Sequence, residues 1–323
     1  MVRQPRRRDV EDLQQSLIGL LENFGDLLES GTLREKVHSL ISAHHALRDL
    51  GRSLMLDESG SSARDRILSY FRAYPGQVIA GDELMVVAGI SESARRIREL
   101  RVEFGWKIIT GMTIRTIGED EEAAVLKSRD LPKMEPDDYM LVLEQRDRDG
   151  AFRWNVANDI RKSNRSVKAK ILRYLRKNVG EQISGEELSY LAHKKTEWAR
   201  RVRELRTEDG WPIATRQTGN PNLAVGIYVL ERDRQAPTHD RTISDYVRVQ
   251  VLKRDGYRCR GTFDDGKRCG WHPDEWSRAD SRFLELHHVI GHAAGGSNEA
   301  ENLITVCNVC HDEIHRRAGR PPD

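Results

Sequence analysis

The chain contains an internal repeat, in which two long segments about a hundred positions apart match each other in order. The closest match pairs residues 94–101 with 199–206, and a Gly-Trp pair follows in both copies. Further matches pair 66–72 with 170–176, 81–84 with 185–188, and 141–144 with 228–231. A duplication of this length predicts two domains of the same fold.

Each copy has the same order of apolar patterns: a helix, a short helix, a turn, a third helix, and two apolar β runs. This order resembles the winged-helix form of the helix-turn-helix, so we expect winged-helix domains at 61–150 and 160–235. The segment between Gly111 and Asp138 of the first copy is expected to be a long wing loop. The charged stretches 145–170 and 232–240 are expected to be exposed connectors.

The third helix of each copy is rich in arginine. Its apolar residues fall on one face, which leaves four arginines toward the other side: Arg95, Arg96, Arg200 and Arg201. We predict that these arginines bind DNA, because such helices can enter the major groove. The alternatives are a solvated face with Arg–Glu pairs at helical spacing, or a surface for protein contacts.

Residues 1–60 are expected to form a helical hairpin. Apolar residues recur at spacings of three and four from Val10 to Leu27, which predicts a helix over 10–28. Gly31 breaks the pattern, and Thr32 with Glu35 has the spacing of a capping box that starts a second helix. The apolar stripe is narrow, so it either packs internally or serves as the seam of a homodimer.

All four cysteines lie near the end of the chain: Cys259, Cys269, Cys307 and Cys310. In an intracellular protein such crowding indicates metal binding, with two disulfides as the alternative. The C-x-x-C spacing of the last two suits a tetrahedral ion, and four thiolates leave no open position. We therefore expect a structural Zn²⁺ that stands in for a core in the segment 243–323, called the C-terminal module below.

Between and after the cysteine pairs lie a His-His pair in an apolar run, a Gly-Gly pair, Asn302, His311 and His315. This series resembles the HNH endonuclease family, also called the ββα-metal or His-Me fold, with His288, Asn302 and His311 as the three name-giving residues. The resemblance covers about 75 residues, and its elements occur in the family's order.

The resemblance implies a role for each residue. His288 would be the general base that activates water, and His287, on the opposite face of the same strand, would hold the catalytic metal. His311 and His315 would complete the ligands, although His315 could equally contact phosphate. Asn302 would bond backbone across a loop and help orient the base, and Glu285 would orient a ligand from the metal's outer shell.

The sequence does not determine which divalent ion the histidines would hold. Many relatives carry a carboxylate where this chain has His287, and imidazoles suit Mn²⁺, Ni²⁺ or Zn²⁺ better than Mg²⁺. Substrate phosphate could compensate for the missing carboxylate, so Mg²⁺, Mn²⁺ and Ni²⁺ all remain candidates.

The sequence thus predicts a multidomain α+β protein that cuts double-stranded DNA, as a restriction endonuclease of type II or one that depends on modified bases. Mobile-element or homing nucleases, and a non-catalytic DNA-binding regulator with structural zinc, are the alternatives. The formal net charge is only +2, so overall charge does not indicate a polyanion partner. With no apolar run of roughly 18 residues and no secretion signal, we expect a cytoplasmic protein of a prokaryotic cell, without a membrane partner.

Overall fold

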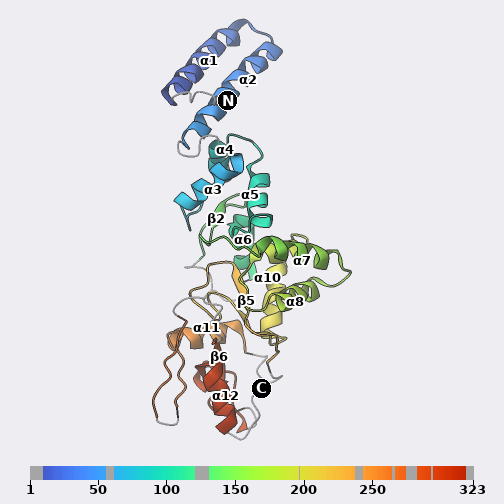
Figure 1. The fold of residues 1–323 in the computed structure, drawn as a ribbon, viewed down its shortest axis with the longest axis vertical. Helices are drawn as coiled ribbons and strands as arrows, with labels where there is room; N and C mark the ends of the chain where they lie inside the picture. The colour runs from blue at the N-terminus through green and yellow to red at the C-terminus, as the bar shows by residue number, and fades with distance from the viewer. Residues whose placement is uncertain are drawn as a thin grey trace, which may run out of the picture. The chain divides into compact units, whose positions relative to one another are not determined.

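The computed structural model describes residues 10–55, 62–120, 131–195, 197–236, 243–263, 266–273, 282–291 and 294–317. The chain divides into two compact units, one of residues 1–108 and 137–150 and the other of 109–136 and 151–323. The structure contains helices and small sheets, which agrees with the predicted mixed α and β class (Figure 1). None of the helices in these described ranges is both long and apolar enough to cross a membrane.

The first unit begins with a helical hairpin. Helices α1 (Val10–Ser30) and α2 (Leu33–Ser53) lie side by side (Figure 1). The predicted capping box is present, because the Thr32 hydroxyl accepts from the Glu35 amide and the Glu35 carboxylate accepts from the Thr32 amide at 2.8 Å. These reciprocal bonds satisfy amides that the helix itself cannot pair, which fixes the start of α2.

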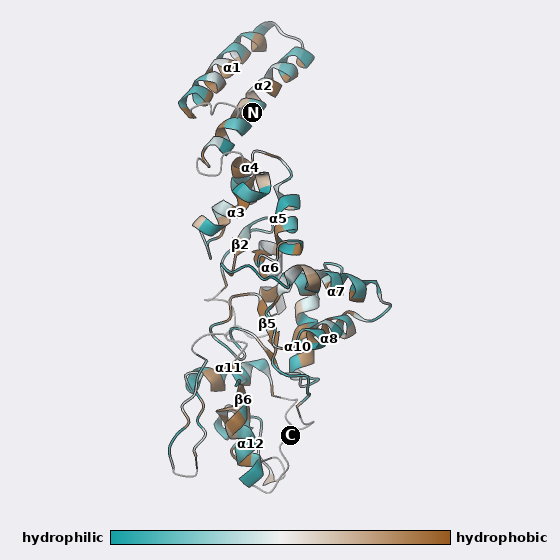
Figure 2. Cartoon of the chain, in the orientation of Figure 1, coloured by the Kyte–Doolittle hydropathy of each residue, from teal (hydrophilic) through white to brown (hydrophobic). Residues whose placement is uncertain are grey.

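The apolar seam of α1 is partly covered, and other apolar side chains of the hairpin are not. All six seam residues are buried or half-buried: Val10, Leu13, Leu17, Leu20, Phe24 and Leu27. Figure 2 shows hydrophobic and hydrophilic residues intermixed along both helices. Exposed apolar side chains include Ile18, Leu21 and Leu28 on α1 and Leu40, Ile41 and Leu47 on α2. The seam residues are thus the covered apolar side chains of α1, which lies beside α2, and other apolar side chains of the described hairpin stay exposed.

The two copies fold into the same order of elements. The first contains α3 (Ala63–Ala73), α4 (Gly81–Ala88), α5 (Ser93–Val102), β1 (Ile108–Thr110) and β2 (Tyr139–Leu141). The second contains α8 (Val167–Lys177), β3 (Ile183–Ser184), α9 (Gly185–Leu191), α10 (Trp198–Thr207), β4 (Ile213–Ala214) and β5 (Ile227–Leu230). Matched positions form both cores, for example Ile67 with Ile171 and Leu84 with Leu188.

Backbone pairing corrects one of the sequence matches. Gly76 donates to Leu141 O in the first copy, and Gly180 donates to Leu230 O in the second. Val142 donates to Lys107 O in the same way that Glu231 donates to Pro212 O. The last strands therefore correspond as 139–142 with 228–231, two residues away from the match of 141–144 with 228–231, because hydrogen bonding fixes register where apolar runs do not.

Two segments expected to be irregular are helical instead. Helix α6 (Gly111–Asp120) lies where a long wing loop was predicted, and the Thr113 hydroxyl donates to Glu186 of α9 at 2.6 Å. Helix α7 (Gly150–Lys162) lies in the predicted connector 145–170 and packs Ala157 and Ile160 into the core of the second copy. The charged composition was misleading because Arg153 of α7 is buried against Glu187 at 3.2 Å.

The C-terminal module contains α11 (Asp245–Arg254), β6 (Leu284–His288), the 3-10 turn η4 (Ala300–Asn302), β7 (Leu303–Cys307) and α12 (Asn308–Arg317). Strands β6 and β7 pair antiparallel, with Leu286 opposite Thr305. The carboxylate of Asp255, just after α11, accepts from the buried Thr305 amide at 2.8 Å. This bond ties the helix to the strand that leads into the last cysteine pair.

Candidate active site

The four cysteines meet at the junction of a turn, a strand and a helix. Bonds from Cys269 N to Gly261 O and from Gly270 N to Cys259 O bring the first two cysteines together. Strand β7 ends at Cys307, and the first turn of α12 carries Cys310. Their four sulfur atoms all lie within 4.8 Å of one another, so the structure gathers the set that the sequence predicted.

The geometry of this cluster fits a zinc ion. The sulfurs of Cys269 and Cys307 are 4.0 Å apart, close to the roughly 3.8 Å edge of a tetrahedron with Zn–S bonds of about 2.3 Å. A Cβ atom on Gly261 would lie 2.8 Å from the Cys310 Cβ, so the backbone is shaped to admit the sulfurs. A hydrogen bond with Cys259 and burial raise the pKa of Cys307, and a bound cation would favour the thiolate form of this residue.

Strand β6 places its two histidines, His287 and His288, on opposite faces. Burial alternates along it, with Leu284, Leu286 and His288 buried and Glu285 and His287 half-buried. Alternation in a β-strand therefore separates the predicted base, His288, from the predicted metal ligand, His287. The sequence anticipated this arrangement because the apolar run has a period of two.

Three imidazoles gather on the Glu285 and His287 side of β6. Ligand nitrogens of His287, His311 and His315 all lie within 4.8 Å of one another, and Nε2 of His315 is 3.1 Å from Nε2 of His311. His311 and His315 share one face of α12 at a spacing of four. Three neutral imidazoles with half-buried rings suit a divalent transition metal, so the residues present fit the predicted ion.

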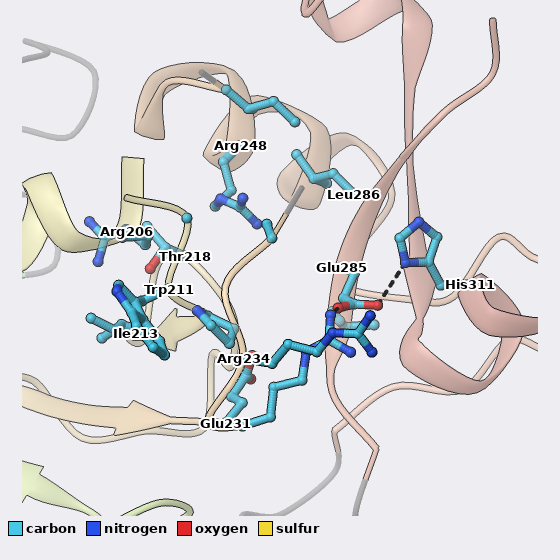
Figure 3. A pocket seen from close by; sticks show the side chains of 16 residues that line it. Arg206, Trp211, Ile213, Thr218, Glu231, Arg234, Arg248, Glu285, Leu286 and His311 are labelled. Carbon is cyan, nitrogen blue, oxygen red and sulfur yellow. Dashed lines mark hydrogen bonds and ion pairs between the residues drawn. The ribbon is translucent and has the colours of Figure 1, made fainter. Parts of the chain in front are cut away.

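Glu285 connects this cluster to a neighbouring arginine. Its Oε2 is 2.8 Å from Nδ1 of His311 (Figure 3). Its Oε1 accepts from Arg232 at 2.6 Å. Burial alone would raise the pKa of the Glu285 carboxyl, but His311 and Arg232 lower it on balance. The predicted orienting role of Glu285 therefore has a physical basis: a carboxylate that faces the ring nitrogen opposite the cluster.

His288, the predicted base, contacts Asn298, a residue that sequence reasoning missed. Nε2 of His288 is 2.7 Å from Oδ1 of Asn298, and only 8% of His288 is exposed. An amide oxygen at this distance accepts a hydrogen bond from a protonated Nε2, which leaves Nδ1 as the basic nitrogen. Asn298 lies ten residues beyond the base, and the only signal near it was the Gly-Gly pair just before.

Asn302 holds the backbone next to His288. Its Oδ1 accepts from Ile290 N at 2.9 Å, while its Nδ2 donates to Ile290 O at 3.0 Å and to Ser297 O at 2.9 Å. A Cβ atom on Gly296 would lie 1.7 Å from Ile290 O, so only glycine permits this approach. Asn302 thus bonds backbone across the loop, as the resemblance implied, while Asn298 is the side chain in contact with His288.

The four arginines of the third helices are engaged in ion pairs along their own helices. Arg96 donates to Glu99 at 2.7 Å, and Arg201 donates to Glu204 at 2.7 Å. Arg95 and Arg200 lie 3.6 Å and 3.2 Å from the same carboxylates and are more than half exposed. These pairs are those expected of a solvated face, and a role in DNA binding stays a prediction.

Comparisons with known families agree with both parts of this description. The family model of the KpnI N-terminal domain matches residues 64–142 and 168–231, and that of the HNH endonuclease matches residues 267–317. The first pair of ranges coincides with the two copies of the repeat. Neither curated proteins nor solved structures gave a match. The chain therefore carries an HNH endonuclease domain at 267–317, preceded by two segments similar to the KpnI N-terminal domain and joined to a four-cysteine cluster of zinc-site geometry.

Proposed function

We propose that the protein is a DNA endonuclease that hydrolyses one phosphodiester bond with His288 as general base. The observation that carries this proposal is the geometry of β6, which holds His288 on one face and His287 with the imidazole cluster on the other. In-line attack on a phosphodiester needs a base on one side and a cation on the other.

The chain's own residues have separate tasks in this reaction. His288 takes the proton of the attacking water at Nδ1, while Asn298 keeps Nε2 protonated. A divalent cation held by His287, His311 and His315 would stabilise the charge on the departing 3′ oxygen. If the family pattern holds, the products carry 5′-phosphate and 3′-hydroxyl ends.

We further propose that the enzyme is a restriction endonuclease. The match of both copies to a KpnI N-terminal domain supports this, together with a nuclease domain that follows them in the same chain. The two copies would be winged-helix readers of the target sequence, at 61–150 and 160–235. A mobile-element or homing nuclease remains the alternative and would show a longer target sequence.

The test is cleavage of supercoiled plasmid and of methylated and unmethylated genomic DNA, with Mg²⁺, Mn²⁺ or Ni²⁺ and sequencing of the ends. His288→Ala should lower the rate by about a hundredfold or more and leave DNA binding intact. His38→Ala, a substitution of an exposed histidine on α2, is the matched control. Full activity of His288→Ala would refute the assignment of the base, and inactivity of the wild type on every DNA would favour a non-catalytic regulator.

We propose that the protein acts as a homodimer. A double-strand break at a palindromic site needs two nuclease centres related by a twofold axis. The uncovered apolar side chains of α1 and α2, among them Leu21, Leu28 and Leu47, offer a self-complementary surface. Sedimentation of the protein, free and on DNA, tests this: deletion of 10–55 should convert a dimeric double-strand cutter into a nickase or a weak binder, and a strict wild-type monomer that makes double-strand breaks would refute it.

A further inference from the structure

The junction between the second copy and the C-terminal module contains an ion pair that reaches the imidazole cluster. Arg232 lies two residues after the end of β5 of the second copy, and its Nη2 donates to Oε1 of Glu285 at 2.6 Å. Only 27% of the arginine and 13% of the glutamate side chain are exposed. Solvent screens a charge pair with this little exposure only weakly. Removing either partner would leave the other charge buried without compensation, which is unfavourable.

The second oxygen of Glu285 faces the metal cluster. Oε2 of Glu285 bonds Nδ1 of His311 at 2.8 Å (Figure 3). The Nδ1 proton therefore points to the carboxylate, and the Nε2 lone pair points to the other ligands. Nε2 of His311 is indeed the atom 3.1 Å from His315. The rotation of the His311 ring therefore depends on where the carboxylate of Glu285 lies.

Arg232 is placed by the second copy and by a ring of the C-terminal module. The preceding residue, Glu231, donates its amide to Pro212 O at 2.9 Å, which joins this segment to the sheet of the second copy. The guanidinium of Arg232 lies 5.4 Å from the centroid of Phe283, just before β6. An arginine held by the sheet, an aromatic ring and a carboxylate has little freedom to swing away.

Arg232 donates to Glu285 directly at 2.6 Å, whereas the charge of the neighbouring Arg248 acts on the same carboxylate without a hydrogen bond in the described structure. A cavity of about 80 Å³ at the junction is lined by charged residues that include Arg206, Glu231, Arg232, Arg248 and Glu285. Arg206 pairs with Asp245, and Glu231 is a buried carboxyl that supplies no positive charge to Glu285. Among the described residues, Arg232 is the arginine whose ion pair with Glu285 falls within bonding distance.

We propose that Arg232 is a positioning residue of the catalytic metal site, which it reaches by fixing Glu285 and thereby His311. The second copy then completes the metal site of the C-terminal module, and the module alone would bind the metal weakly. This inference rests on the proposed function, since it assigns the imidazole cluster to the catalytic metal.

The test measures Mn²⁺ binding to the zinc-loaded full-length protein by calorimetry and by the electron paramagnetic resonance signal of free Mn²⁺. Replacing an outer-shell partner of a metal ligand weakens metal binding by about 10- to 100-fold. Because Arg232 acts on such a partner, Glu285, and not on a ligand itself, Arg232→Ala should raise the Mn²⁺ Kd by about tenfold, at the low end of this range. Arg232→Lys keeps the charge and should recover part of the affinity. Zinc content and melting temperature are measured for each variant to separate folding from metal binding.

Arg206→Ala is the matched control, because it removes the Arg206–Asp245 pair of the same junction without touching Glu285. It should leave Mn²⁺ binding within about twofold of wild type, far below the 10- to 100-fold effect of an outer-shell partner. Wild-type affinity in Arg232→Ala, or an equal loss in Arg206→Ala, would overturn the inference while the proposed function stands. Failure of the wild type to bind Mn²⁺ would instead remove the metal site, and the proposed function with it.

Discussion

Asn302 offers a sharp test of how the loop beside His288 contributes to the reaction. Asn302→Ala removes three hydrogen bonds, to Ile290 N, Ile290 O and Ser297 O, which range from 2.9 to 3.0 Å. At about 1 kcal/mol each, the three contribute on the order of 3 kcal/mol to the loop conformation. Since about 1.4 kcal/mol corresponds to a tenfold change, the population that brings Asn298 to His288 should fall by about a hundredfold.

The isosteric Asn302→Asp variant separates hydrogen bonding from volume. Its carboxylate still accepts from Ile290 N, but its second oxygen would face the carbonyl oxygens of Ile290 and Ser297. We therefore expect a loss of rate at least as large as in Asn302→Ala. The assay is single-turnover cleavage at saturating metal, with Mn²⁺ affinity measured in parallel, because the imidazole cluster lies on the other face of β6. A rate within threefold of wild type in Asn302→Asp, or an equal loss of metal affinity, would refute this account.

Three more outcomes follow from the geometry. Cys307→Ser should release zinc and unfold the C-terminal module, and a stable, zinc-free, active variant in a metal assay would contradict the zinc assignment. Burial raises the pKa of Asp255, but bonds from Arg254 and the Thr305 amide lower it on balance, so its stabilisation is present above about pH 4 and is lost as pH falls below that value. Asp255→Asn should thus be less stable than wild type at pH 7, with the gap in denaturant unfolding narrowing toward pH 3; a constant gap would contradict this. Replacing Arg200 and Arg201 together by Ala should weaken DNA binding and reduce its salt dependence, whereas unchanged affinity would favour the solvated face.

Local patterns predicted much of the fold. The capping box at Thr32 and the alternation along β6 were predicted well because both depend on neighbours a few residues apart. Composition gave a wrong prediction for α7. A charged stretch is predicted to be an exposed connector unless the partners of its charges are known. Arg153 is buried because Glu187 of α9 and Glu181 lie within ion-pair distance, and neither is near it in sequence.

In the candidate site too, sequence reasoning found the residues with local patterns and missed those that act through tertiary contacts. The cysteine and histidine spacings predicted which residues gather, because metal ligands come in recognisable pairs on turns and helices. Asn298 and Arg232 were missed because each acts across a tertiary contact. The first depends on the close approach of Gly296 to Ile290, and the second on a connector that meets β6 from 53 positions away. A residue type alone gives no sign of such a contact.

Helix α12 carries residues of both the four-cysteine cluster and the imidazole cluster, so the positions of the two clusters depend on each other. Cys310 and His311 are adjacent in this helix, and neighbouring residues of a helix point about 100° apart, so the Cys310 side chain joins the other three sulfurs while that of His311 joins the other two imidazoles. The four-cysteine cluster fixes the rotation of α12, and this rotation determines where His311 and His315 lie. Strand β7 adds a second link, because it ends at Cys307 and pairs with the strand that carries His287. Removal of the structural zinc should therefore abolish binding of the second metal even though the two clusters have no ligand in common.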